Sequence, residues 1–117
     1  MSIIVDRFKK IKSNIHKNIN IVAVSKTFNY EVISPLVEYG HKHFGENKVQ
    51  EAEVKWKDAK QKDQTIQLHM IGKLQSNKAK KAVEIFDYIH SLDTQKLVDT
   101  LCVQEMNLNK KLKYFIQ

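Results

Sequence analysis

Apolar residues recur along the chain at spacings that alternate between those of helices and those of strands. The first set has the i, i+4, i+7, i+11 spacing of one helix face and predicts an amphipathic helix: Ile4, Phe8, Ile11 and Ile15. The β-branched run 19–25 follows and is typical of a buried strand. The chain is therefore predicted to begin with a helix and then a strand.

A second helix is predicted between Asn29 and Gly40. Asn29 can accept a backbone hydrogen bond as its N-cap, and Gly40 can adopt the left-handed conformation that ends a helix. Pro35 lies inside this segment and lacks a backbone N–H, so we expect a kink or only short turns there. The apolar residues of the helix are Val32, Ile33, Leu36 and Val37.

The alternation continues to the end of the sequence. Ser76 is the expected N-cap of the fourth helix, and Asp93 or Thr94 is that of the fifth. Strands are predicted at 43–46, 66–71, 88–92 and 113–117. The helices between them carry three apolar sets: Val49, Ala52, Trp56 and Ala59; Ala79, Ala82, Val83 and Phe86; and Leu97, Val98, Leu101 and Cys102, extending toward Met106.

This order predicts an α/β fold. Strand and helix alternate about five times at the spacing of βαβ units, which implies a parallel sheet with right-handed crossovers. Periodicity alone does not distinguish an open sheet from part of a barrel. The sequence ends in an apolar strand without a helix to cover it, and a (β/α)8 barrel needs roughly 200 residues or more. We therefore expect an incomplete domain.

Composition narrows the class of protein further. A chain of 117 residues with 42% hydrophobic residues suits one domain with its own core. No apolar run approaches the roughly 18 residues of a membrane helix, and the first residues do not read as a signal peptide. Cys102 is the only cysteine, which excludes an internal disulfide and a multi-cysteine zinc site. We expect a cytoplasmic protein.

The positive charge does not by itself predict nucleic-acid binding. The formal net charge is +7, but Arg7 is the only arginine, and specific readers of bases and phosphates depend on the planar fork of arginine. One lysine cluster surrounds residues 76–77 and could contact phosphate groups near a helix N-terminus: Lys73, Lys78, Lys80 and Lys81. A solvated helix face is the simpler interpretation. We expect no specific nucleic-acid partner.

Candidate chemistry collects where the predicted strands end, because parallel sheets bind their ligands at the carboxyl ends of strands. Lys26 directly follows the apolar run 21–24, so its amine lies near the mouth of the sheet. Partial desolvation there favours the neutral, nucleophilic amine that forms Schiff bases with aldehydes. The alternative is a lysine that extends along the strand end and keeps its amine in water.

The other strand ends offer weaker candidates. Asn47 could line a ligand pocket or cap the helix that follows, and His69 could contact a ligand or be a core histidine with satisfied hydrogen bonds. His41 and His43 are too isolated to predict a metal site. The sequence contains no Gly-rich phosphate loop, no His-Glu-x-x-His motif and no convincing Ser/His/Asp order. Neither a metal ligand set nor a catalytic residue is predicted.

Four motifs lie at these strand ends. Three of them surround the candidate residues: 22–27 (Val-Ala-Val-Ser-Lys-Thr), 44–47 (Phe-Gly-Glu-Asn) followed by 49–51 (Val-Gln-Glu), and 69–72 (His-Met-Ile-Gly) followed by 74–78 (Leu-Gln-Ser-Asn-Lys). The fourth is the segment 86–93. Together they resemble the pyridoxal phosphate homeostasis proteins. The resemblance extends from about Ile21 to the C-terminus, and the order of the motifs makes it far more specific than any one of them.

The resemblance implies a fold and a cofactor. The family consists of small TIM barrels related to the N-terminal domain of alanine racemase, so residues 1–117 would be the N-terminal portion of a single barrel domain. Its members hold pyridoxal 5′-phosphate as a Schiff base on the lysine that corresponds to Lys26. Asn47 and His69 match motif positions that face the cofactor pocket. Family members are regarded as carriers or regulators of the cofactor, so we expect a non-catalytic role.

Two further expectations and one alternative follow from the resemblance. Family members have roughly twice this length, and barrels of this class usually hold the cofactor phosphate in their late loops, so we expect weak binding by this chain alone. The open barrel edge at 114–116 favours self-association. A racemase-like enzyme that uses the same cofactor is the first alternative function, and it requires a second acid–base group that the sequence does not reveal. A basic module that associates with RNA or DNA through the lysine cluster from Lys73 to Lys81 is a second, less favoured alternative that rests on charge and not on the resemblance.

Overall fold

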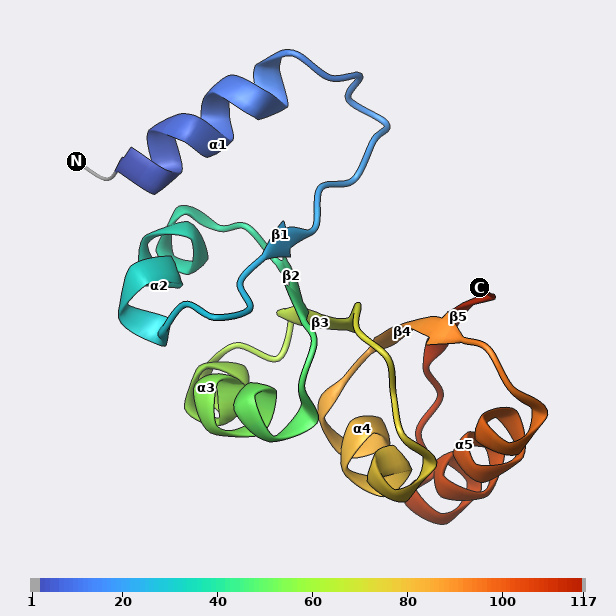
Figure 1. The fold of residues 1–117 in the computed structure, drawn as a ribbon. Coiled ribbons are helices and arrows are strands. Elements are labelled where there is room, and N and C mark those ends of the chain that lie inside the picture. Colours follow the sequence, from blue (N-terminus) through green and yellow to red (C-terminus); the bar gives the residue numbers. More distant parts are fainter. Residues whose placement is uncertain (1–2, 117) are drawn as a thin grey trace.

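The computed structural model describes residues 3–116, in which five parallel strands lie side by side in chain order (Figure 1). The expected α/β class and number of strands are confirmed. The elements are α1 (Ile3–Ser13), β1 (Ala23–Val24), α2 (Tyr30–Tyr39), β2 (His43–Glu46), α3 (Val49–Lys62), β3 (Gln67–Met70), the 3-10 turn η1 (Ser76–Lys78), α4 (Ala79–Ile85), β4 (Tyr88–Leu92), α5 (Gln95–Leu108) and β5 (Lys113–Ile116). None of the helices over residues 3–116 is long and apolar enough to cross a membrane.

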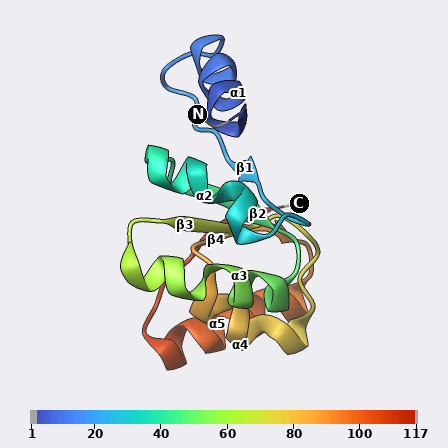
Figure 2. The ribbon, with the colours of Figure 1, turned by 90° about the vertical axis from the view of Figure 1, so that its left-hand side faces the viewer.

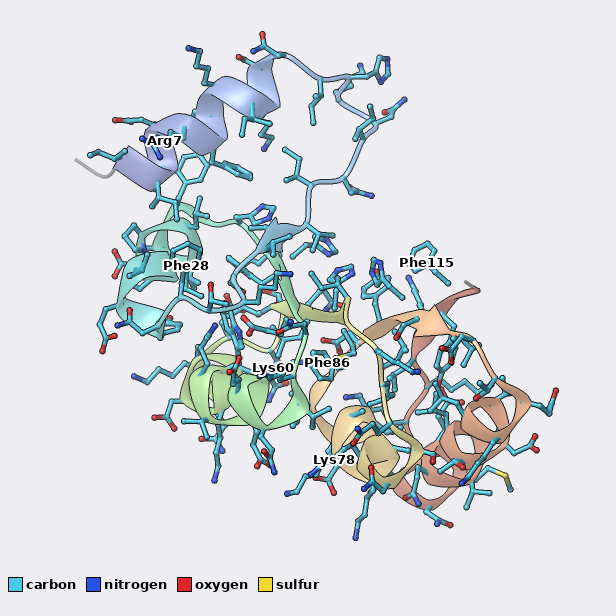
Figure 3. All side chains as sticks on the ribbon, viewed as in Figure 1. Arg7, Phe28, Lys60, Lys78, Phe86 and Phe115 are labelled. Atoms are coloured by element: carbon cyan, nitrogen blue, oxygen red, sulfur yellow. The ribbon has the colours of Figure 1, made fainter. Side chains whose placement is uncertain are left out.

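The helices α2 to α5 follow the outer side of the curved sheet, and α1 lies beside α2 (Figures 1 and 2). Alternate strand residues therefore have different surroundings. Phe44 and Leu68 are register partners on the helix side, where Phe44 packs against Trp56 of α3 with ring centroids 4.7 Å apart. Figure 3 places Phe86 between the sheet and the helices and Phe115 on the other side of the sheet. We call this other side the inner face.

The predicted helix faces are correct where a helix covers the sheet. All four residues of the α3 set and all four of the α4 set are buried, as are Leu97 and Leu101 in α5. Cys102 and Met106 are exposed, because α5 presents only part of its apolar stripe to α4 and the sheet. At the end of the chain β5 matches the predicted strand, although residue 117 lies outside the described residues.

The first predicted strand is much shorter and less buried than expected. β1 contains only Ala23 and Val24; Val24 is 52% exposed and Ile19 is 56% exposed. β1 lies at the edge of the sheet and pairs only with β2, so neither its outer edge nor its inner face is covered within the described part of the chain. Apolar composition therefore overstated both the length and the burial of this strand.

The apolar stripe of the first helix is only partly used. Phe8 is buried and contacts the rings of Tyr39 and His41, at centroid distances of 6.0 and 4.5 Å. Ile11 is 56% exposed, and Ile15 follows the helix end at Ser13. The predicted amphipathic helix is therefore present, but its apolar face is only partly buried because α1 packs on α2 and not on the sheet.

The second helix confirms its predicted ends and runs through its proline. Asn29 Oδ1 accepts a hydrogen bond from the Val32 N–H, at 3.2 Å, and Gly40 ends the helix with φ of 108°. The expected break into short turns at Pro35 is wrong. A helical residue in that position would donate its N–H to the carbonyl of Glu31. The hydroxyl of Ser34 donates to that carbonyl instead, at 3.0 Å, which compensates for the missing donor.

Of the N-caps predicted for the last two helices, that of α5 is confirmed and that of α4 is wrong. Thr94 caps α5, because its side chain accepts a hydrogen bond from the Leu97 N–H at 3.2 Å. The predicted cap at Ser76 is wrong: Ser76 begins η1, and α4 starts at Ala79 without a side-chain cap. The 3-10 turn lies directly before α4 and supplies its own hydrogen bonds, so α4 needs no capping hydroxyl from Ser76.

Loss of the Asn29 cap should destabilise the fold measurably. We expect Asn29→Ala to lower the free energy of unfolding by about 1 kcal/mol, since the Val32 N–H loses its acceptor. Asn29→Asp keeps an acceptor oxygen and is the matched control, with little loss expected. Urea unfolding monitored by Trp56 fluorescence measures both. Equal destabilisation by the two variants would contradict the capping role.

Candidate functional site

The turn after β1 carries Lys26 between a buried and a strained residue. Ser25 is 1% exposed. Thr27 has φ of 70°, in the left-handed region that β-branched residues rarely adopt. The Phe28 N–H donates to the Ser25 carbonyl at 3.3 Å and closes the turn. The backbone around Lys26 is thereby held in one unusual conformation.

The side chain of Lys26 is exposed, in contrast to the partial desolvation expected for a lysine at a strand end. Within residues 3–116 its amine makes no hydrogen bond or ion pair. The exposure follows from the position of β1 at the sheet edge, next to an inner face without a covering layer in the described part of the chain. An amine in this position is accessible to a small-molecule electrophile.

A buried carboxylate lies directly behind this turn. Glu46, the last residue of β2, is fully buried. Its oxygens accept hydrogen bonds from Lys55 Nζ, at 3.0 and 3.1 Å, and from Trp56 Nε1, at 3.1 Å. The hydroxyl of Ser25 donates to the same carboxylate. The Lys55 side chain is only 9% exposed, so the ion pair is almost completely removed from water.

Asn47 follows β2 and packs tightly against the end of β3. A Cβ atom placed on Gly72 would lie 2.6 Å from the Asn47 Cβ and 2.8 Å from its carbonyl oxygen, so only glycine fits there. The alternative role of Asn47 as a helix cap is wrong, because the residue at the N-cap of α3 is Lys48. Asn47 is half-buried and lines a cavity of about 620 Å³ together with Lys73 and Lys78. Neither Lys26 nor His69 lines that cavity.

His69 is the centre of a row of three histidines across the inner face. His69 Nε2 lies 2.9 Å from His43 Nδ1, and His69 Nδ1 lies 2.8 Å from His90 Nε2. The ring of Tyr88 stacks on His69, with centroids 4.1 Å apart and an angle of 4° between the planes. Phe115 contacts the ring of His90 at a centroid distance of 4.6 Å. The expectation of a satisfied histidine therefore holds for His69.

The row keeps His69 uncharged near neutral pH. Burial, together with repulsion from charge on His90 and His43, lowers the pKa of His69 to about 4. Burial also lowers the pKa of His90. A neutral imidazole has one donor and one acceptor nitrogen, so His69 donates to one neighbour and accepts from the other. His69 thus joins a histidine of β2 and a histidine of β4 through its two ring nitrogens.

The lysine cluster near residues 76–77 is partly neutralised. Lys81 pairs with Glu53 of α3 at 2.9 Å and with Glu84 at 3.6 Å. Lys73 and Lys80 are exposed.

The described residues contain no group of three or more histidine, cysteine or carboxylate side chains that could hold a metal ion.

Sequence reasoning missed two parts of this site. The buried pair of Glu46 and Lys55 appears in the sequence as ordinary charged residues, and only the fold shows that they meet behind Ser25. The histidine row had a weak signal in advance, because His43, His69 and His90 all lie in predicted strands. The register between those strands decides that the rings meet, and periodicity does not provide it.

Comparison with known proteins shows one consistent group of relatives. No protein-family model matches the chain. The pyridoxal phosphate homeostasis protein of Pasteurella multocida is 40% identical over 99 residues, which cover 85% of this chain and 42% of the relative. That of Synechocystis is 38% identical over 103 residues, covering 88% of this chain and 47% of the relative. The chain thus spans less than half the length of these curated relatives.

Solved structures agree with the sequence comparison. PipY of Synechococcus elongatus, solved with PLP (pyridoxal phosphate) bound, superposes with a TM-score of 0.89 and 38% identity, over 95% of this chain and 52% of that chain. An alanine racemase of Clostridium difficile superposes with a TM-score of 0.75 at 13% identity, which shows the fold alone. The expected resemblance is confirmed, and the partial coverage fits its N-terminal half. The five strands are βα units of a TIM barrel.

Protonation of His69 should destabilise the fold in acid. Its folded pKa of about 4 lies below the value of about 6.5 for an unfolded histidine, so the unfolded chain binds more protons between these values. Lowering the pH from about 7 to about 4.5 should therefore cost about 2–3 kcal/mol through this residue. Urea unfolding at both pH values measures this cost. Between them, we expect the free energy of unfolding to fall by about 2–3 kcal/mol less in His69→Gln than in the unaltered chain.

The matched control is His16→Gln, which removes an exposed histidine from the loop after α1. Its loss of stability in acid should equal that of the unaltered chain. The assignment of the acid sensitivity to His69 is wrong if His69→Gln and His16→Gln lose stability equally.

Proposed function

We propose that this chain, which resembles the pyridoxal phosphate homeostasis proteins over less than half of their length, binds pyridoxal 5′-phosphate through Lys26. Its role would be to hold the cofactor in cytoplasmic cofactor homeostasis rather than to catalyse a reaction. The observation that carries the proposal is the exposed Lys26 amine, without a partner in residues 3–116, on the turn with left-handed Thr27 at the carboxyl end of β1.

The chemistry of the residues at this edge fits the aldehyde end of the cofactor. Bound pyridoxal phosphate supplies an electrophilic aldehyde, and an accessible primary amine is the side chain that reacts with such a group. Nothing among the described residues competes for the Lys26 amine through an ion pair. PipY of Synechococcus elongatus, which is 38% identical to this chain, was solved with PLP bound.

Asn47 and His69 are proposed as the neighbouring cofactor contacts. The register supports this assignment, because Val24, Gly45 and His69 are partners on adjacent strands, and Lys26 and Asn47 each follow that row by two residues. The low pKa of His69 leaves an uncharged imidazole next to the site near pH 7. The separate cavity that Asn47 lines argues for a weaker role of Asn47 than of Lys26.

We further propose that binding is weak in this chain alone. An exposed amine does not exclude water from the bond it forms, and such a bond is reversible in water. A non-catalytic role is favoured because racemisation needs two groups that move protons on opposite sides of the cofactor. A racemisation assay on alanine with added cofactor distinguishes the enzyme alternative.

Selective labelling tests the role of Lys26. The purified chain is mixed with near-stoichiometric pyridoxal phosphate and reduced with borohydride, and the modified peptides are mapped by mass spectrometry. We expect the label to concentrate on Lys26 and to disappear in Lys26→Arg, which keeps the charge but removes the primary amine. Lys111→Arg, at an exposed lysine of the α5–β5 loop, is the control and should label as the unaltered chain does. Label scattered over surface lysines would refute the proposal.

Self-association through the open sheet is proposed for the same chain. Within the described residues β5 pairs only with β4, and Phe115 is 52% exposed on the inner face. An unpaired strand edge next to an apolar side chain favours pairing with another chain. We expect concentration-dependent association in sedimentation velocity, reduced by Phe115→Glu. A monomer at all concentrations would contradict this proposal.

A further inference from the structure

The turn that carries Lys26 is poorly held by the sheet itself. β1 is only two residues long and pairs with β2 alone, at the positions of Ala23 and Val24. A strand with so few ladder positions does little to constrain the segment that follows it. Since Lys26 itself is exposed, other contacts have to fix where its backbone lies.

Ser25 supplies those contacts through all three of its polar groups. Its N–H donates to the Gly45 carbonyl at 3.0 Å, and its carbonyl accepts a hydrogen bond from Lys55 Nζ at 2.6 Å. Its hydroxyl donates to the Glu46 carboxylate. The residue directly before Lys26 is therefore tied to β2 and to α3 at once.

The buried charge of Glu46 makes this arrangement specific. A carboxylate without access to water requires hydrogen-bond donors and a counter-ion, and an unsatisfied one is strongly unfavourable. Ser25 and Lys55 fill that requirement, and the Lys55 amine simultaneously binds the Ser25 carbonyl. Any movement of the turn would break contacts to the buried pair.

We propose that Glu46 is a positioning residue for Lys26 and acts through Ser25 and Lys55. The inference rests on the proposed function, since it concerns how the Lys26 amine is presented to the aldehyde of pyridoxal phosphate. The alternative is that the Glu46 network only stabilises the packing of β2 against α3. In that case, weakening any of its hydrogen bonds would affect stability alone.

Two substitutions separate these roles because each removes one donor to the same oxygen, Glu46 Oε2. Ser25→Ala removes the donor on the Lys26 side. Trp56→Phe removes the donor on the helix side and also thins the packing against Phe44, so it should cost at least as much stability. A positioning role predicts that only the first affects Lys26.

The experiment compares the two variants with the unaltered chain of 117 residues. Near-stoichiometric pyridoxal phosphate and borohydride give the ratio of label on Lys26 to label on exposed Lys111 as an internal reference. We expect this ratio to fall about fivefold in Ser25→Ala, the equivalent of one hydrogen bond, and to stay unchanged in Trp56→Phe. Hydrogen exchange of the amides of residues 26–28, without cofactor, should become faster in Ser25→Ala only. Urea unfolding confirms that both variants are folded.

The outcomes distinguish this inference from the function on which it rests. If the unaltered chain labels Lys26 selectively but Ser25→Ala does so equally well, the positioning role is wrong and the proposed function stands. Equal losses in both variants would also overturn it, because general destabilisation would then explain them. If the unaltered chain shows no selectivity for Lys26, the proposed function fails, and faster exchange at residues 26–28 in Ser25→Ala alone would still support the contact of Glu46 with the turn.

Discussion

The buried carboxylate of Glu46 joins the parts of the molecule on which the candidate site depends. It lies at the end of β2, receives its counter-ion Lys55 and the indole of Trp56 from α3, and binds the hydroxyl of Ser25 at the end of β1. Because the loss of a partner from a buried charge is strongly unfavourable, the Glu46 network favours one relative arrangement of these three elements. The exposed turn that carries Lys26 begins at the residue that completes this network.

The sheet is asymmetric, and this asymmetry decides where chemistry is available. Helices cover its outer side, where residues such as Phe44 and Ile89 are fully buried. The inner face instead carries the linked histidines, of which His69 stays uncharged because burial and its neighbours lower its pKa. In a closed barrel this face becomes the interior. The exposed Val24 and Phe115 are explained in the same way, as positions that a closed barrel would cover.

The elements could be predicted from the sequence wherever a helix packs directly on the sheet. The α3 stripe around Trp56 and the caps at Asn29 and Thr94 depend on local spacing and local hydrogen bonds, which are properties of short segments. The sequence overstated the length and burial of β1 and did not show that much of the apolar face of α1 stays exposed, because burial depends on which other elements cover a segment. The expectation of only short turns at Pro35 is wrong, because the helix continues and the hydroxyl of Ser34 replaces the missing donor.

The sequence by itself determined the alternation of strands and helices, the parallel sheet, and the motif that makes Lys26 the candidate amine. These properties depend on residue type and short-range spacing. Only the tertiary structure decided that Lys26 is exposed, that Glu46 is buried beneath Ser25, and that three histidines form one row. The reason is physical: burial and hydrogen bonding between strands depend on register and on which face a helix covers, and neither is a property of any single segment.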